Sequence, residues 1–229
     1  MNDVKLFYDK LQFPGHYTLS GLSYHDPNIR NPYLKIINRH LSNNMSVLDV
    51  GCGTGLIANL FARKYPKSKF VGIDFADSID YAQQFAQTHL ISNAQFIKQD
   101  ISQHKFAETY DVIICQGVLH HIPDYQNAAK LLVSALRPGG KLILGLYHPW
   151  GKIAKKIFNI NYKNDILFQD QELHPYETTF NLAQVKLLFP NLKLVDAFPT
   201  MINTLNRIYA LVNSRNGGLT VYILEKSND

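Results

Sequence analysis

The chain has 229 residues, of which 46% are hydrophobic and 18% are charged. This composition excludes a disordered chain and a coiled coil, and the length fits one α/β domain. The net charge of +5 comes without a dense basic run. The nearest is Lys152, Lys155 and Lys156, which we interpret as a solvated helix face, so a nucleic-acid partner is not expected.

The two cysteines predict a reducing environment. Cys52 and Cys115 lack CxxC spacing and both follow apolar strand-like runs, which predicts buried thiols and no metal site. The N-terminus has no basic-then-apolar leader, and no apolar stretch reaches ~18 residues. We therefore expect a cytoplasmic protein without a membrane partner.

The order of apolar patterns along the chain predicts the fold class. The first 44 residues are irregular and aromatic up to a helix pattern that follows Pro32. Apolar runs at 46–50, 70–73, 94–97, 112–115 and 142–146 predict five strands with helices between them. A helix near 180–189, a strand near 192–198, a short helix within 200–218 and a strand near 219–225 complete the chain. Such alternation predicts a parallel sheet with helices on both faces.

The most informative segment is VLDVGCGTG at residues 47–55, at the end of the first predicted strand. Glycines at a strand-to-helix turn permit positive φ and a close approach of a ligand to the backbone. Ligands of open α/β sheets bind beyond the carboxyl ends of the strands. A dinucleotide loop reads GxGxxG, but Leu56 stands where its third glycine would be. The loop therefore argues against NAD.

Two carboxylates follow the next two strands. Asp74 ends the second strand, where an ionised acid can accept hydrogen bonds from two ribose hydroxyls. Asp100 follows the third strand, where it either accepts from the exocyclic amine of a purine or caps a helix.

Taken together, these segments resemble the class I S-adenosylmethionine-dependent methyltransferases, in the branch that acts on small molecules. The resemblance covers residues 46–148 and rests on five segments in the family's order: VLDVGCGTG (47–55), GIDF (72–75), FIKQDI (96–101), YDVIICQGVLHHIPD (110–124) and LRPGGKLIL (136–144). It implies an α/β fold with a Rossmann-like seven-stranded, mostly parallel sheet, helices on both faces and an antiparallel last strand. We expect one domain over 1–229, made of an aromatic cap (1–44), a cofactor-binding core (45–148), a cap insert (149–178) and C-terminal helix and strands (179–229).

The resemblance also implies S-adenosyl-L-methionine as the cofactor and a set of residues around it. Acids in the site suit the cationic sulfonium and ammonium of this molecule. The implied set is Asp49, Gly51, Cys52, Gly53 and Gly55 around the methionine moiety, Asp74 and Phe75 at the ribose, Asp100 and Ile101 at adenine, and Gln116 beside the methionine end.

Methyl transfer from a sulfonium is an in-line displacement, so the protein mainly aligns the reactants and excludes water. A general base is needed only where the acceptor must lose a proton. His120 and His148 are the candidate bases, because they follow the fourth and fifth strands. For the adjacent His121 we favour a structural role.

Two aromatic segments outside the repeating core are candidates for the acceptor pocket: the N-terminal stretch and residues 149–178. Their aromatics could also simply pack a cap over the sheet. We expect residues 7–25 to cover the cofactor and to help bind a small, partly apolar acceptor. The candidate residues for this cover and for the substrate are Phe13, His16, Tyr17, Tyr24 and Trp150.

The predicted function is methyl transfer to an oxygen, nitrogen or carbon of a small molecule. Two alternatives stay open: a methyltransferase acting on protein or RNA, and a cofactor-binding module without catalysis. The family's N/D/S-P-P-aromatic sequence for nucleobase amines is replaced by Cys115-Gln116-Gly117-Val118, which disfavours that acceptor.

Overall fold

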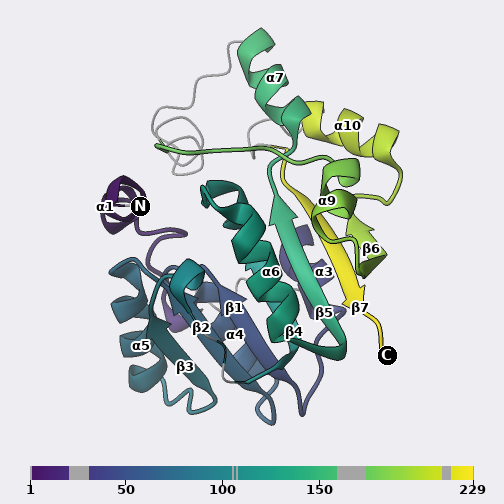
Figure 1. The fold of residues 1–229 in the computed structure, drawn as a ribbon. Coiled ribbons are helices and arrows are strands. Elements are labelled where there is room, and N and C mark those ends of the chain that lie inside the picture. The colour runs from purple at the N-terminus through teal and green to yellow at the C-terminus, as the bar shows by residue number, and fades with distance from the viewer. Residues whose placement is uncertain are drawn as a thin grey trace.

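A computed structural model of the chain describes residues 2–20, 31–104, 106, 108–158, 174–212 and 218–228. Within these residues the centre of the molecule is a seven-stranded sheet of order β3-β2-β1-β4-β5-β7-β6 (Figure 1). The strands are β1 (Ser46–Val50), β2 (Lys69–Asp74), β3 (Ala94–Lys98), β4 (Tyr110–Gln116), β5 (Leu136–Leu146), β6 (Leu192–Phe198) and β7 (Thr220–Lys226). Strands β1 to β5 pair in parallel, and β7 pairs antiparallel with β5 and β6. The predicted fold class is confirmed.

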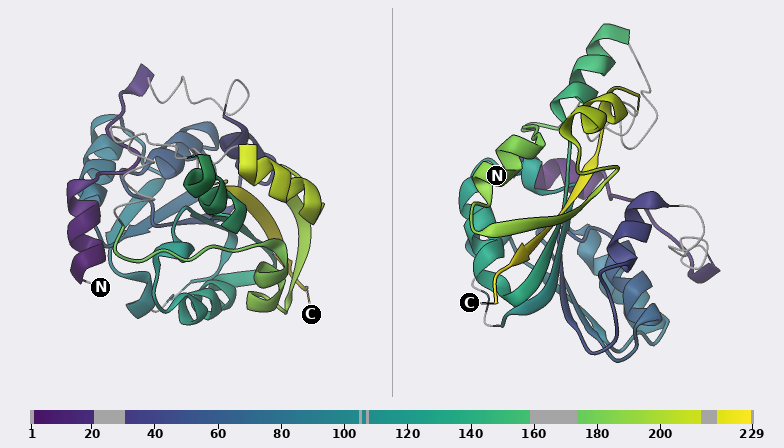
Figure 2. Two further views of the ribbon diagram at one scale, coloured as in Figure 1. Left: turned by 90° about the horizontal axis from the view of Figure 1, so that it is seen from above. Right: turned by 90° about the vertical axis from the view of Figure 1, so that its right-hand side faces the viewer.

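Helices cover both faces of this sheet. They are α1 (Asn2–Lys10), α3 (Pro32–Asn38), α4 (Leu56–Lys64), α5 (Ser78–Thr88), α6 (Tyr125–Ala135), α7 (Pro149–Phe158), α9 (Leu182–Leu188) and α10 (Asn203–Val212). One buried cluster joins α3, α4 and α5 to the sheet, and a second joins α6 and α9 to the opposite face (Figure 2). The central strands lie between two apolar layers, which explains why β4 is a continuous apolar run with residues 112–115 fully buried.

Two elements differ from the sequence-based expectation. Residues 2–10 form helix α1 rather than an irregular segment. Strand β5 begins at Leu136 rather than at residue 142, because Leu136 pairs with Tyr110 before the register shifts around Pro138, Gly139 and Gly140. The pairing between strands therefore continues past residues that end a pattern in the sequence.

The two helices α7 and α10 stand together beyond the carboxyl end of β5 (Figure 1). No helix in the described part of the chain is both long enough and apolar enough to cross a membrane.

Candidate functional site

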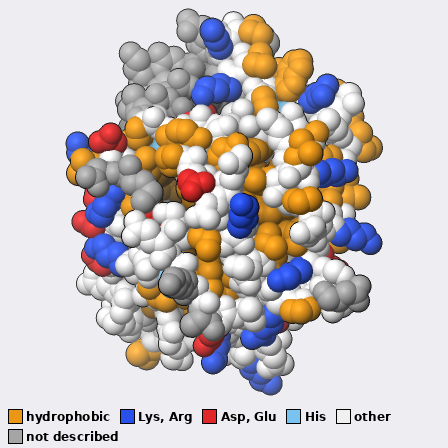
Figure 3. Space-filling model, viewed as in Figure 1, with side chains coloured by type: hydrophobic (Ala, Val, Ile, Leu, Met, Phe, Trp, Pro, Cys, Tyr) orange, Lys and Arg blue, Asp and Glu red, His pale blue; other side chains and the backbone are white. Residues whose placement is uncertain are grey.

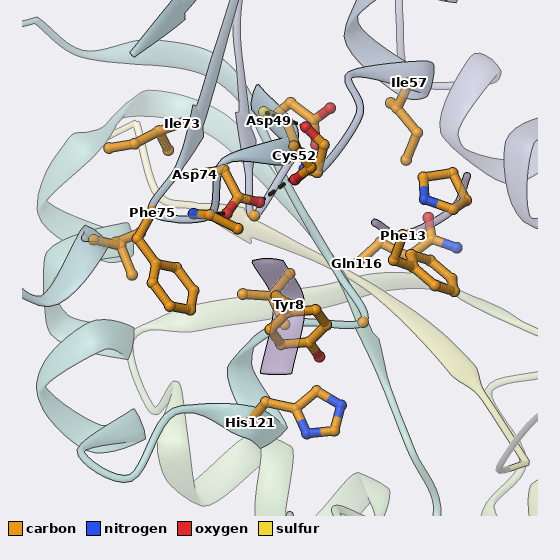
Figure 4. Close-up of a pocket in the computed structure, with 18 of the residues that line it drawn as sticks. Tyr8, Phe13, Asp49, Cys52, Ile57, Ile73, Asp74, Phe75, Gln116 and His121 are labelled. Atoms are coloured by element: carbon orange, nitrogen blue, oxygen red, sulfur yellow. Dashed lines mark hydrogen bonds between the residues drawn. The ribbon is translucent and has the colours of Figure 1, made fainter. Parts of the chain in front are cut away.

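A cavity of about 470 Å³ opens beyond the carboxyl ends of β1, β2 and β4 (Figure 4). Of the ten residues that the sequence places around the cofactor, all except Gly55 contribute to its wall. The wall includes Asp49, Gly51, Cys52, Gly53, Asp74, Phe75, Asp100, Ile101 and Gln116, together with Tyr8, Phe13, Val118, His121, Ile122, Tyr147 and Leu219. The structure thus brings the strand-end residues to one place, and their binding roles stay predictions.

The glycine loop follows β1 and turns into α4. Gly51 and Gly53 have φ of +66° and +53°, a backbone region that favours glycine. Gly55 is the N-cap of α4 with φ of +76°, and it packs against Ala82 and Phe96 rather than facing the cavity. This close packing leaves no space for a Cβ atom, so Gly55 shapes the turn from behind.

Asp74 ties the end of β2 to the glycine loop. Its Oδ2 accepts a hydrogen bond from the Gly53 backbone nitrogen at 2.8 Å, and its Oδ1 accepts from the Ala76 nitrogen at 2.9 Å. The side chain is buried, and this burial raises the pKa of the carboxyl. Each carboxylate oxygen can accept a second hydrogen bond, so Asp74 can hold the loop and bind a ligand hydroxyl.

Asp49 carries a buried carboxylate oxygen that lacks a partner. Its side chain is 3% exposed, and Oδ2 makes no hydrogen bond within the described part of the chain. Burial is the main cause that raises the pKa of Asp49 to about 8, and the charge of Asp74 adds to it. A buried acid without a counter-charge costs free energy, and a bound cation would remove that cost.

Asp100 caps a turn and also lines the cavity. Its Oδ1 accepts from the backbone nitrogen and the hydroxyl of Ser102, both at 2.8 Å, and so caps the 3₁₀ turn Ile101–Gln103. Asp100 also belongs to the cavity wall, as does Gln116, whose buried Oε1 has no partner among the described residues. Capping therefore does not remove Asp100 from the site.

The N-terminal residues 2–20, here called the N-terminal cover, contact the glycine loop through hydrogen bonds to Thr54. The Thr54 backbone nitrogen donates to the Phe13 carbonyl at 3.1 Å, and the Thr54 hydroxyl donates to the Gly15 carbonyl at 3.0 Å. The Tyr17 hydroxyl donates to the Thr54 carbonyl at 2.9 Å and accepts from Asn59 Nδ2 at 2.9 Å. These bonds attach the cover to the loop from which the cavity is built.

Helix α1 of the cover lies against the turn between β2 and α5. The Lys5 ammonium pairs with Asp77 at 3.1 Å, and the Asp77 backbone nitrogen donates to Asp9 at 2.8 Å. The same helix extends Val4 and Tyr8 into the cavity wall, and Figure 4 shows Tyr8 between Phe75 and His121.

The residues expected in the cover and at the substrate are spread over different places. Phe13 belongs to the cavity wall, and Tyr17 holds the glycine loop from outside that wall. His16 stacks on Tyr81 with ring centroids 4.1 Å apart, and Trp150 lies on α7 outside the wall. Tyr24 lies outside the described residues.

Neither candidate base from the sequence is part of the cavity wall. His120 is fully buried, and burial together with His121 and His174 lowers its pKa well below 6.5. The His148 Nδ1 accepts a hydrogen bond from the Trp150 backbone nitrogen at 3.2 Å, and burial beside Arg207 lowers its pKa to about 4. Both rings are therefore neutral near pH 7, and their catalytic role stays a prediction.

His121, which the sequence favoured as structural, does contribute to the cavity wall. Its Nδ1 lies 3.1 Å from the Tyr176 carbonyl oxygen, which can only accept, so Nδ1 carries the proton. In the neutral ring the lone pair is then on Nε2. Its ring contacts those of Tyr8, His120 and His174. Sequence spacing could not separate His121 from His120, since the 3₁₀ turn Leu119–His121 decides which of them faces the cavity.

Comparisons with known proteins agree with this architecture. A family model described as a methyltransferase domain matches residues 41–165. The ubiquinone biosynthesis O-methyltransferase of Coxiella burnetii strain Dugway 5J108-111 is 33% identical over 158 residues, which cover 64% of this chain and 65% of that protein. The protein of that name from Salmonella arizonae is 30% identical over 111 residues, 46% of this chain and 44% of that protein. The matched part thus spans roughly half to two thirds of these curated relatives.

Solved structures show the same fold at low sequence identity. The N-methyltransferase NodS from Bradyrhizobium japonicum, in complex with S-adenosylhomocysteine, has a TM-score of 0.61 at 17% identity and covers 99% of both chains. The magnesium protoporphyrin IX methyltransferase ChlM from Synechocystis, with bound S-adenosylhomocysteine, has a TM-score of 0.62 at 17% identity and covers 96% of this chain and 93% of that chain. With a family model that matches more than half of its length, this chain belongs to the methyltransferase domain family, whose cofactor is S-adenosylmethionine.

Proposed function

We propose that this protein transfers the methyl group of S-adenosylmethionine to an oxygen of a small, largely apolar acceptor. One observation carries the proposal: a single cavity joins the acidic, glycine-rich strand ends to a chamber with aromatic and aliphatic walls and His121. The first part suits the donor and the second suits the acceptor. Transfer to oxygen is supported by the relatives that are named O-methyltransferases.

The residues at the strand ends fit this cofactor. The carboxyl of Asp49, whose Oδ2 has no partner among the described residues, can ionise when a cation enters the cavity beside it. S-Adenosylmethionine has no phosphate, and its methionine end carries ammonium and sulfonium charges. Gly51 and Gly53 line this end of the cavity, and the space that side chains would need there is taken by Val118 and by the Phe13 carbonyl oxygen. We therefore assign the methionine moiety to this end of the cavity.

The remaining cofactor contacts follow from the hydrogen-bond acceptor atoms in the cavity wall. Asp74 would accept from the ribose hydroxyls through its second lone pairs, and Asp100 would accept from the adenine amine. The buried Oε1 of Gln116 would accept from a donor at the methionine end. When bound, S-adenosylmethionine supplies an electrophilic methyl group, and the protein holds the acceptor oxygen in line with it.

The acceptor side of the cavity is apolar. Its wall contains Phe13 and Tyr8 from the N-terminal cover, Val118 and Ile122 after β4, and Leu219 before β7. Such walls suit an aromatic ring or an alkyl group and exclude water from the transfer. A phenolic hydroxyl fits this chamber better than an amine that is charged at neutral pH, because the described residues that form this side of the cavity include no acidic side chain.

A phenol must lose its proton for efficient attack, and His121 is a residue on the acceptor side of the wall that can take it. Its Nδ1 is committed to the Tyr176 carbonyl, so the neutral ring presents a basic Nε2. The surrounding rings of Tyr8, His120 and His174 fix the imidazole in position. We therefore propose His121 as the general base, in preference to His120 and His148.

Two measurements test the proposed function. Calorimetry with S-adenosylmethionine and with NADH tests the donor, and we expect binding of the first alone. Release of S-adenosylhomocysteine is then measured with phenols, catechols, amines, a protein mixture and RNA as acceptors. Turnover with phenols or catechols supports the proposal, and turnover with protein or RNA alone would replace it. Tight cofactor binding without turnover on any acceptor would favour a binding module instead.

A further inference from the structure

Helices α7 and α10 together form an exposed apolar surface, here called the α7–α10 surface. The helices pack against each other and bury Ala154, Asn206 and Ala210. Each helix leaves an apolar row of i, i+3, i+7 spacing in solvent, and such a row lies on one helix face. The rows are Trp150, Ile153 and Ile157 on α7, which are 37%, 44% and 68% exposed, and Leu205, Ile208 and Val212 on α10, which are 48%, 52% and 78% exposed.

This concentration of apolar side chains is specific to one region of the molecule. Of the 13 large hydrophobic residues that are exposed in the described part of the chain, eight belong to this surface, since Met201 and Ile202 lie just before α10. The others are scattered over several elements. Figure 3 shows hydrophobic side chains gathered over α7 and α10, with lysine and arginine side chains around them. Contiguous exposed apolar patches mark interaction sites more often than scattered residues do.

The charge of the surface has a single sign. Residues 149–158 and 200–212 contain Lys152, Lys155, Lys156 and Arg207 and no Asp or Glu. Lys152 pairs with Glu177 at 3.1 Å, while Lys156 and Arg207 are exposed. On α7, Lys152 and Lys156 are four residues apart and therefore share one face of the helix. This face lies next to the face that carries the apolar row. A tryptophan, aliphatic side chains and flanking cations are the features of a helix that lies in a membrane interface.

We propose that the α7–α10 surface docks the protein on an anionic lipid bilayer, which departs from the sequence-based expectation of no membrane partner. The two apolar rows enter the boundary between headgroups and acyl chains, and Lys156 and Arg207 contact the anionic headgroups. A second copy of the chain is a poorer occupant, because two like-charged surfaces would then face each other. The docking is independent of the proposed methyl transfer.

The location of the surface connects it to the cavity. Tyr147 contributes to the cavity wall, and α7 begins two residues later at Pro149. The Tyr209 hydroxyl on α10 lies 3.0 Å from the hydroxyl of Tyr33, which is also part of the wall. Docking would therefore bring the cavity close to an acceptor dissolved in the bilayer.

The chain provides its own probe, since Trp150 is its one tryptophan. Vesicles of phosphatidylcholine mixed with phosphatidylglycerol should shift the Trp150 emission to the blue, and brominated lipids should quench it. Pure phosphatidylcholine vesicles should bind more weakly, and high salt should weaken the anionic case. No change in Trp150 emission and no co-sedimentation with the anionic vesicles would overturn the proposal.

Matched variants distinguish docking through this surface from nonspecific adsorption to vesicles. Ile157→Glu and Ile208→Glu should each lower the vesicle partition coefficient about tenfold or more. Lys156→Glu should lower it about 25-fold, at about fivefold per unit of charge. The controls Leu90→Glu and Leu187→Glu alter residues that are 88% and 81% exposed on other elements, and they should leave binding unchanged. Equal losses in the controls would overturn the proposal. So would a doubled mass in sedimentation without vesicles that Ile157→Glu abolishes, because a second copy would then occupy the surface.

Discussion

The backbone oxygen of Phe13 accepts a hydrogen bond from the Thr54 nitrogen at 3.1 Å and occupies the place that a Cβ atom on Gly53 would take. The N-terminal cover and the glycine loop are therefore in direct backbone contact. The backbone N–H of Gly53 also donates a hydrogen bond to Asp74 Oδ2. One glycine thus serves the cover and the cofactor side of the cavity together.

Replacing this glycine tests the contact between cover and loop. In Gly53→Ala the new methyl group collides with the Phe13 carbonyl, so either the cover or the loop must move. We expect the affinity for S-adenosylmethionine to fall about tenfold or more, as for a site displaced from its binding geometry. Calorimetry measures this change.

The control for Gly53→Ala is Gly139→Ala. Gly139 has a similar φ of +70°, and its Cβ would meet only the side chain of Asn228. Both variants carry the backbone strain of alanine at positive φ. Equal affinities in the two variants would show that the contact with Phe13 does not matter for binding.

The Tyr17 hydroxyl provides a milder test of the cover. Tyr17→Phe removes the bonds to the Thr54 carbonyl and from Asn59, which should lower stability by about 0.5–1.5 kcal/mol per bond. Because Thr54 belongs to the glycine loop, we also expect weaker cofactor binding. Thermal melting and calorimetry report the two effects.

Tyr65→Phe is the matched control. It removes a hydroxyl that donates a hydrogen bond of 2.8 Å to Asn38, and this bond does not belong to the cavity. It should lower stability and leave cofactor affinity unchanged. Deletion of residues 1–18 extends the test and should abolish methyl transfer. Unaltered kinetics in the deletion variant would rule out a role of the N-terminal cover in methyl transfer.

The strand-end site was predictable because it is local in sequence. Each of Asp49, Asp74 and Asp100 follows an apolar run, and a parallel sheet brings such ends to one edge. The cavity wall on the cover side was only partly predictable. Phe13 was expected there, but Tyr8 reaches the wall from helix α1. The nine residues of this helix are too few to show a repeating apolar spacing from which a helix could be predicted.

The histidines also show that sequence alone could not predict every residue of the cavity wall. The sequence favoured His120 as a candidate base and His121 as structural, whereas the turn after β4 places His121 toward the cavity. His148 lies two residues after the end of β5, in a region where site residues are common, but its Nδ1 accepts a hydrogen bond from the Trp150 backbone nitrogen at the start of α7. Such backbone contacts depend on tertiary packing, which no residue spacing reports.

Asp49→Asn is expected to separate binding from stability. The pKa of about 8 means that Asp49 is protonated in the free folded protein at pH 7 and ionised in the unfolded chain. Wild-type stability should therefore decline as the pH rises from about 4 to about 8, and Asp49→Asn should lack the part of this decline that Asp49 causes. Its gain in melting temperature over wild type should grow across that range and level off above it.

The same carboxyl predicts proton release on cofactor binding. A cation beside Asp49 favours the ionised form, so wild-type affinity for S-adenosylmethionine should increase with pH up to about 8. Calorimetry in buffers of different ionisation enthalpy should detect close to one proton released per site at pH 6. Asp49→Asn should bind more weakly and release none. Equal proton release by Asp49→Asn and wild type would assign the coupling to another group.

His121→Ala should lower kcat about 10²- to 10⁴-fold with a phenolic acceptor, as for the loss of a general base. The affinity for S-adenosylmethionine should change little, because His121 stands on the acceptor side of the cavity. His121→Gln is the matched variant: its side-chain amide can still bond the Tyr176 carbonyl, but it cannot take a proton. If His121 acts as the base, both variants lose the rise of kcat with pH that an imidazole base produces. If it only positions the rings of Tyr8 and His174, His121→Gln keeps most of the activity and the pH profile is unchanged. His120→Ala and His148→Ala complete the series, and a loss of kcat with an altered pH profile in either variant would move the base to that residue.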